Sequence, residues 1–199
     1  MTEVNMRNLT NLLPRLLSCL LAATLSISMS VARAQSDDPV ENPRVLMKTT
    51  DGDITIELFA DKSPITVENF LRYVDDGHYD GTVFHRVISN FMIQGGGFDA
   101  ELREKPTRDP ILNESKNKLH NTRGTLAMAR TSDPDSAAAQ FFINQRSNLR
   151  LDWSGGKDGY TVFGEVIDGM QVVDIISLTD TGSAQAQTTR GSTIFQDVP

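Results

Sequence analysis

Thiols are almost absent from this sequence. Its 199 residues include one cysteine, Cys19, close to the amino terminus. A single cysteine cannot form a disulfide within the chain or build a multi-thiolate metal site. The three histidines, His78, His85 and His120, are too far apart in the sequence to indicate a metal-binding motif. The sequence also contains no G-x-S-x-G motif, so nothing points to a serine hydrolase.

Positive charge is scarce as well. The chain carries 19 Lys and Arg residues against 26 Asp and Glu residues, which gives a formal net charge of −7. A chain with this balance is repelled by a phosphate backbone, and this argues against a nucleic acid as the main partner. The hydrophobic share of 39% fits a globular protein with a buried core.

Long hydrophobic runs are limited to one, near the amino terminus. Leu16–Val31 is interrupted by serine and threonine alone, Arg7 and Arg15 precede it, and the small-x-small sequence Ala32–Ala34 follows it. This arrangement is typical of a cleavable secretory signal peptide. The run is shorter than the roughly 20 residues of a membrane helix, which makes a membrane anchor the less favoured alternative.

We therefore divide the chain into three parts: a signal peptide over residues 1–34, a flexible lead-in over residues 35–44 and a folded domain over residues 45–199. Cleavage after Ala34 leaves a mature chain without Cys19 or any other thiol. A chain without thiols suits an oxidising compartment.

Short segments of alternating hydrophobicity predict a mainly β domain. Residues 45–50 and 53–59 flank Asp51–Gly52, a strong hairpin signal. Further strands are expected over residues 82–88, 91–94, 124–129, 140–144 and 160–166.

Two helices are expected among these strands. The first begins with Pro64 after the candidate N-cap Ser63 and ends at Gly77. The second begins at Asp168, where Gln171 completes a capping-box pattern. Many short strands with two helices predict an antiparallel barrel or sandwich.

Residues 84–96 form the most informative segment. Alternate side chains of a strand share a face, so Arg86 projects beside Phe84 and Ile88, while His85 projects from the opposite face. A permanent charge among apolar neighbours indicates a partner or a task for Arg86. His85 is expected to be a hydrogen-bonded structural histidine.

Four segments resemble, in order, the motifs of cyclophilin-type peptidyl-prolyl cis-trans isomerases of bacteria, and the predicted signal peptide favours the exported type. The segments are F-H-R-V-I-S-N-F-M-I-Q-G-G at 84–96, N-T-R-G-T-L-A-M-A-R-T at 121–131, S-A-A-A-Q-F-F-I-N at 136–144 and G-Y-T-V-F-G-E-V at 159–166. The resemblance implies a closed eight-stranded antiparallel barrel capped by two helices, with a proline-binding groove on its outside. It also implies a monomer that acts on proline-containing polypeptides and needs no cofactor or metal, and the predicted signal peptide places this protein in the periplasm.

The resemblance also assigns roles to ten residues. Arg86 falls on the family's catalytic arginine, and Gln94 can orient it and contact the substrate backbone. The groove that binds the substrate falls on Phe91, Met92, Ala129, Arg130, Gln140, Phe142, Leu151 and Tyr160.

These residue types suit prolyl isomerisation on chemical grounds. Rotation about a peptide bond meets a barrier of about 18–20 kcal/mol, because the nitrogen lone pair is delocalised into the carbonyl group. Catalysis needs a donor that favours the twisted proline nitrogen and an apolar slot that holds the ring. A guanidinium that never deprotonates supplies the donor, and Phe91, Met92, Phe142 and Leu151 supply the slot.

Two departures from the family pattern keep a second interpretation open. Arg150 stands where many relatives have an aromatic residue associated with cyclosporin binding, and we expect it to lie apart from the proline slot. The sequence also ends at Pro199, where relatives continue into a final strand, so a sheet edge is left unpaired unless a segment such as Ser192–Phe195 covers it. The alternative function is a peptide-binding chaperone module with the same groove and weak catalysis.

Overall fold

The computed structural model describes residues 1–9 and 42–199 of the chain. The predicted cleavage site after Ala34 and most of the predicted lead-in lie outside the described residues. In the part that is described, no helix has the length and apolar character needed to cross a membrane.

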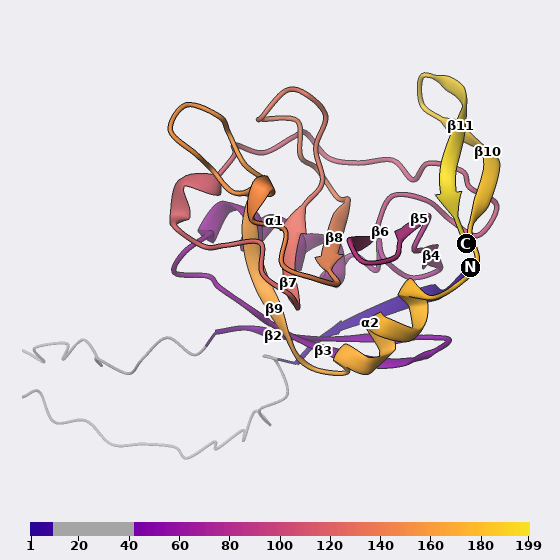
Figure 1. Ribbon diagram of the computed structural model, residues 1–199, viewed down its shortest axis with the longest axis horizontal. Coiled ribbons are helices and arrows are strands. Elements are labelled where there is room, and N and C mark those ends of the chain that lie inside the picture. Colours follow the sequence, from indigo (N-terminus) through magenta and orange to yellow (C-terminus); the bar gives the residue numbers. More distant parts are fainter. Residues whose placement is uncertain (10–41) are drawn as a thin grey trace, which may run out of the picture.

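The main body is one curled, antiparallel sheet of nine strands that wraps into a half-barrel (Figure 1). Its strand order is β4-β1-β2-β3-β9-β7-β8-β6-β5. The strands are β1 (Glu3–Asn8), β2 (Arg44–Thr49), β3 (Gly52–Leu58), β4 (Thr82–Val83), β5 (Arg86–Ile88), β6 (Met92–Gly95), β7 (Thr125–Met128), β8 (Phe141–Asn144) and β9 (Val162–Asp168). The mainly β, antiparallel character confirms the prediction from the sequence.

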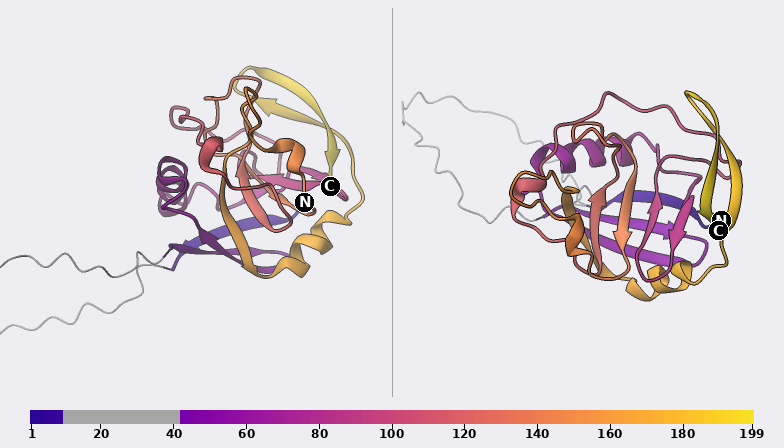
Figure 2. Two further views of the ribbon diagram at one scale, coloured as in Figure 1. Left: turned by 60° about the vertical axis from the view of Figure 1, so that its left-hand side comes forward. Right: turned by 45° about the horizontal axis from the view of Figure 1, so that its top comes forward.

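Two details of the sheet differ from the expected pattern. The strand expected over residues 82–88 is divided into β4 and β5, which form the two ends of the sheet although Phe84 and His85 alone separate them in the chain. The sheet therefore curls far enough to bring its two ends together. A separate hairpin of β10 (Gly182–Thr188) and β11 (Gly191–Val198) stands at one side of the body, near the place where the two termini meet (Figure 2).

Two α-helices, α1 (Pro64–Asp75) and α2 (Met170–Ser177), and two 3-10 turns, η1 (Ser115–Asn117) and η2 (Leu149–Leu151), complete the described elements. Ser63 is the N-cap of α1 as predicted, but its hydroxyl donates to the Val162 carbonyl instead of capping the helix. The carboxylate of Glu114 accepts hydrogen bonds from the Ile65 and Thr66 backbone N–H groups at 3.2 and 2.8 Å. A carboxylate at this end of a helix also interacts favourably with the helix dipole.

The capping box predicted for α2 is wrong. Gly169, with φ of 89°, is the N-cap, and Asp168 is the last residue of β9. A Cβ at position 169 would lie 2.3 Å from the Asp53 carbonyl oxygen, so the chain passes too close to β3 for any side chain. Close packing and a left-handed backbone therefore start this helix, not a side-chain cap.

The core lies between the inner face of the sheet and the helices. Phe70 of α1 packs edge-on against Phe141 of β8, with ring centroids 5.7 Å apart, and against Phe163 of β9 at 5.1 Å. All three rings are fully buried. This packing fixes β8 and β9 against α1 and leaves the outer face of the same strands to form a site.

Strand β1 comes from the segment predicted to be a signal peptide. It pairs with β2 from Val4 opposite Thr49 to Asn8 opposite Val45, and with β4 on its other side. It thus covers the sheet edge that Ser192–Phe195 was suggested to cover; that segment instead lies in β11 and pairs with β10. Cleavage after Ala34 stays a prediction, and it implies that the mature chain loses this strand.

Met6 tests whether β1 stabilises the full-length chain. Its side chain is 4% exposed, so Met6→Ala should lower the free energy of unfolding by about 2–4 kcal/mol in urea titrations. Arg7→Ala, an exposed position of the same strand, is the control and should change it by less than about 0.5 kcal/mol. Equal, small effects of both substitutions would show that β1 is not part of the stable sheet.

His85 is buried between the two ends of the sheet. It is 2% exposed, and its Nδ1 atom has no hydrogen-bond partner, while hydrogen bonds with the Val83 backbone and the Gln140 side chain act on the ring as expected for a structural histidine. Its ring lies 4.7 Å from the Phe98 ring and 5.5 Å from the Phe195 ring. Burial lowers the pKa of His85 from 6.5 to about 4. The neutral ring therefore belongs to the folded state.

This lowered pKa makes stability depend on pH. The unfolded chain binds a proton near pH 6.5, whereas folded His85 binds it near pH 4. The free energy of unfolding should therefore fall as the pH drops through this range, by about 2 kcal/mol at pH 4.5. His85→Phe keeps a ring against Phe98 and should show a loss between pH 7 and 4.5 that is smaller by that amount. Identical losses in both proteins would contradict a buried neutral His85.

Candidate functional site

A row of side chains crosses the outer face of four adjacent strands. Arg86 of β5 lies opposite Gln94 of β6, which lies opposite Phe142 of β8, which lies opposite Ala127 of β7. Residues directly opposite each other in antiparallel strands share a face of the sheet. The register therefore places a guanidinium, an amide and an aromatic ring side by side, as the resemblance implied.

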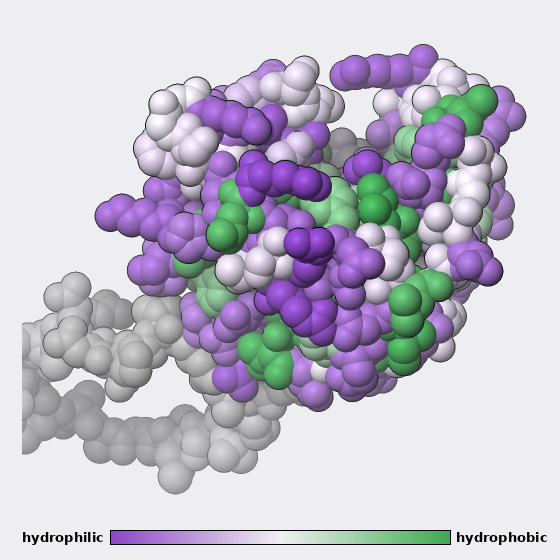
Figure 3. Space-filling model, in the orientation of Figure 1, coloured by the Kyte–Doolittle hydropathy of each residue, from purple (hydrophilic) through white to green (hydrophobic). Residues whose placement is uncertain are grey.

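A small apolar cluster, separate from the main core, lies on this outer face. Its buried members are Met92, Ala127, Phe142 and Val162. Seven partly buried side chains pack against them: Phe59, Ile88, Phe91, Leu119, Ala129, Leu151 and Tyr160. Every apolar residue that was predicted to bind substrate is in this cluster. In the space-filling view its part of the surface is a hollow with green, apolar patches between two raised, mainly hydrophilic lobes (Figure 3).

The amide groups of Gln94 and Gln140 join two strands at the edge of this cluster. Gln94 Nε2 donates to Gln140 Oε1 at 3.0 Å. A Cβ at Gly97 would lie 2.5 Å from Gln140 Cγ, so glycine at this position leaves the space that the glutamine occupies. The Gln140 carbonyl accepts the Ala129 N–H at 2.9 Å, which ties the end of β7 to the same place.

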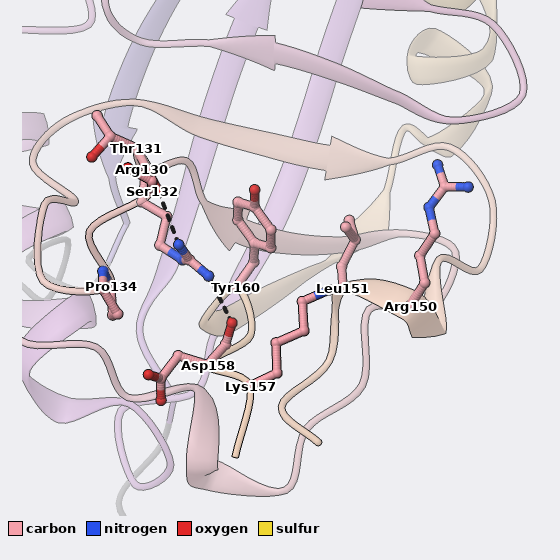
Figure 4. Close-up of a pocket in the computed structure, with 9 residues that line it drawn as sticks. All are labelled: Arg130, Thr131, Ser132, Pro134, Arg150, Leu151, Lys157, Asp158 and Tyr160. Atoms are coloured by element: carbon pink, nitrogen blue, oxygen red, sulfur yellow. Dashed lines mark hydrogen bonds between the residues drawn. The ribbon is translucent and has the colours of Figure 1, made fainter. Parts of the chain in front are cut away.

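Arg130 forms the opposite wall together with Tyr160. Its guanidinium donates to the carbonyl oxygens of Thr131, Asp158 and Gly159 at 2.6–3.2 Å. The same group lies over the Tyr160 ring, 4.6 Å from its centroid (Figure 4). Tyr160 in turn meets Phe142 edge-on at 5.6 Å. Arg130 therefore orients an aromatic wall of the cluster, a role that the sequence did not reveal.

Arg86 is the most exposed member of the site. Its side chain is 44% exposed, and its Nε atom lies 3.8 Å from Asp197 Oδ2 on β11. The neighbouring Phe195 packs against the ring of His85. The β10–β11 hairpin thus stands beside the arginine and forms one side of the site. The sequence gave no signal for this contact, because the hairpin is far from Arg86 along the chain.

A chain of buried amides supports the loop that carries Phe91. Asn148 Nδ2 donates to the Phe91 carbonyl at 2.9 Å and to Asn144 Oδ1 at 2.8 Å. Asn144 Nδ2 donates to Asn121 Oδ1 at 3.2 Å, and Asn121 Nδ2 donates to Asp152 Oδ1 at 2.9 Å. The network spans from β6 to the turn after η2, so it fixes Phe91 relative to Leu151.

Asp152 anchors this network as an ionised group. Burial opposes its ionisation, but hydrogen bonds from the backbone and side chain of Asn121 and from His120 outweigh burial and lower its pKa. Sequence reasoning missed the network, because its residues are spread from Asn121 to Asp152 in the chain and form no local pattern.

A cavity of about 830 Å³ adjoins the apolar cluster. It shares Leu151 and Tyr160 with the cluster, and its other walls include Arg130, Arg150 and Lys157 (Figure 4). Arg150 does not lie apart from the proline slot as expected. Its guanidinium carbon is 4.8 Å from the centroid of the Phe91 ring, since a cation is attracted to the face of an aromatic ring.

Taken together, these groups can hold a small apolar ring and present a hydrogen-bond donor to it. Arg86 supplies the hydrogen-bond donor, and Gln94 and Gln140 supply amides that can pair with a peptide backbone. The described residues include no group of three or more His, Cys, Asp or Glu side chains placed to hold a metal ion.

Comparisons with known proteins agree with this geometry. The family model described as cyclophilin type peptidyl-prolyl cis-trans isomerase/CLD matches residues 44–196. A peptidyl-prolyl cis-trans isomerase of Acinetobacter baylyi is 57% identical over 142 residues, which cover 71% of this chain and 76% of the relative. Peptidyl-prolyl cis-trans isomerase B of Escherichia coli is 53% identical over 158 residues, covering 78% and 92%.

A solved structure shares the fold as well. It is a cyclophilin type peptidyl-prolyl cis-trans isomerase of Cryptosporidium parvum, crystallised in the presence of the dipeptide Ala-Pro. The TM-score is 0.60 at 28% sequence identity, and the match covers 78% of this chain and 96% of that chain.

Proposed function

The chain belongs to the cyclophilin-type peptidyl-prolyl cis-trans isomerases, enzymes that catalyse rotation about the peptide bond before proline, and we propose that Arg86 and the outer apolar cluster carry out this reaction. The observation that carries the proposal is the register Arg86–Gln94–Phe142, which sets the guanidinium beside the apolar cluster. Its substrates are X-Pro bonds in unfolded or folding polypeptides, and one chain supplies the whole site.

The apolar cluster holds the proline ring. Phe142 and Met92 form its buried floor, while Phe91, Leu151 and Tyr160 form partly exposed walls. A slot of this kind restrains the ring while leaving the preceding carbonyl group free to swing. Methionine adds a shape that adapts to both isomers, because its side chain is unbranched and polarisable.

Arg86 lowers the rotation barrier itself. In the twisted transition state the proline nitrogen regains its lone pair and becomes a hydrogen-bond acceptor, whereas in the planar amide it accepts poorly. A donor aimed at this nitrogen therefore stabilises the transition state more than either ground state, which is the condition for catalysis. Gln94 and Gln140 hold the substrate backbone beside it. No bond is made or broken and no proton is transferred.

The alternative function, a peptide-binding chaperone module with weak catalysis, has one observation in its favour. Asp197 faces the Arg86 guanidinium at 3.8 Å and competes with substrate for it. Both side chains are about 40% exposed or more, and exposed ion pairs are typically worth 0–1 kcal/mol. A substrate that buries Arg86 displaces such a partner readily, so the enzyme is the function that we propose.

Arg86→Ala tests the mechanism. Removing one transition-state donor should lower kcat/KM by about 10²–10³, or about 3–4 kcal/mol. The measurement is a protease-coupled isomerisation assay with a proline tetrapeptide, together with circular dichroism to confirm the fold. Arg72→Ala is the matched control, because Arg72 lies on the exposed face of α1 and pairs with Glu68. A folded Arg86→Ala protein with the turnover of the control would overturn the role of Arg86.

We also propose that the protein is exported to the periplasm. The support is the order of Arg7 and Arg15, the apolar run Leu16–Val31 and the small residues up to Ala34. In a Gram-negative host, the periplasmic fraction should contain a chain whose amino terminus is Gln35, as read by mass spectrometry. Recovery of the intact chain from the cytosol or the membrane would refute cleavage.

A further inference from the structure

Three cations that form no ion pair with the carboxylates of the described residues line the cavity beside the apolar cluster. They are Arg130, Arg150 and Lys157, and Asp158 is the single carboxylate among the nine residues that line the cavity. The cavity walls therefore carry a formal charge of about +2 in a chain whose net charge is −7. We name Arg130, Arg150 and Lys157 the basic rim.

The basic rim differs from most of the arginines in the described residues. Six arginines form ion pairs with carboxylates: Arg44, Arg72, Arg86, Arg103, Arg108 and Arg123. The arginines of the rim are held by other means. Arg130 donates to three backbone carbonyls, and Arg150 lies over the Phe91 ring. Their orientation is thus fixed while their charge is not neutralised by a carboxylate.

Lys157 completes the rim from a loop. Its backbone pairs with Ser154 at 2.8 and 3.1 Å in a tight turn, while its exposed side chain forms no ion pair within the described residues. Figure 4 shows Leu151 and Tyr160 between the two arginines, with Lys157 next to Leu151, and all five residues line the cavity.

We propose that the basic rim selects substrates with an acidic residue directly before or after the proline. The inference rests on the proposed function, because it places the proline in the apolar cluster. Leu151 and Tyr160 belong to both the cluster and the cavity. An extended chain advances roughly 3.3–3.6 Å per residue. A residue adjacent to the proline can therefore place its side chain in the cavity while the proline lies in the apolar cluster. An Asp or Glu side chain there meets cations that form no ion pair with any carboxylate in residues 1–9 and 42–199, whereas a Lys side chain is repelled.

Matched peptides test this selectivity. The probes are proline tetrapeptides that differ at one position next to the proline, before or after it, which holds Glu, Gln or Lys. At low ionic strength kcat/KM should be about three- to tenfold higher for the Glu peptide than for the Lys peptide at one of the two positions, as expected for exposed ion pairs. In about 0.5 M salt the ratio should fall toward one, because salt screens the interaction between the charged peptide side chain and the exposed cations of the basic rim.

Charge reversal locates the effect. Lys157→Glu should lower the Glu-to-Lys ratio by about threefold or more and leave the rate on the Gln peptide within about twofold. Arg150→Gln should lower the same ratio. Lys48→Glu is the control, since it makes the same change in net charge at an exposed position of β2, outside the cavity.

The outcomes separate this inference from the proposed function. Turnover of the Gln peptide with a Glu-to-Lys ratio near one at both positions overturns the selectivity and leaves the isomerase intact. A ratio that Lys48→Glu lowers as much as Lys157→Glu also overturns it, because the effect then reflects net charge. Absence of turnover on all three peptides refutes the proposed function itself.

Discussion

The antiparallel register of β5, β6 and β8 is the constraint on which the site depends. Arg86, Gln94 and Phe142 stand opposite one another, so their side chains leave the same face of the sheet. Their neighbours Val87, Ile93 and Ile143 point the other way and are buried in the core. A slip of one residue would send the arginine into the core and the core residues into the site. Burial of the inner side chains therefore fixes the register, and the register fixes which side chains lie on the outer face.

Much of this arrangement follows from the local sequence. Alternation correctly put Arg86 and Ile88 on one face, although Phe84, expected on the same face, lies in the main core. Asp51–Gly52 is enough to predict the hairpin of β2 and β3. The apolar residues of the pocket were found through motif resemblance, and the structure gathers them into one cluster. These features are predictable because they depend on chain neighbours, on the period of a strand, or on motifs that appear in the same order.

The features that the sequence did not predict depend on contacts between distant segments. Arg150 meets the Phe91 ring, and Asp197 faces Arg86, across long separations in the chain. The start of α2 was mispredicted because Gly169 is required by its closeness to β3, not by a capping side chain. Strand β1 was not foreseen, because a segment rich in signal-peptide features says nothing about an unpaired sheet edge. Tertiary contacts decide each of these cases.

The exposure of Arg86 follows from the same topology. Because β5 is the last strand of the sheet, no further strand covers the arginine, and the β10–β11 hairpin approaches it from the side instead. Phe195 holds the hairpin there by packing against the rings of His85 and Phe98. The His85 ring stays uncharged because burial lowers its pKa. The proposed donor, Arg86, is thus solvated enough to receive a substrate, yet the residue directly before it in the chain is buried. A buried, neutral His85 thus directly precedes an exposed, charged Arg86, and both residues contact the β10–β11 hairpin.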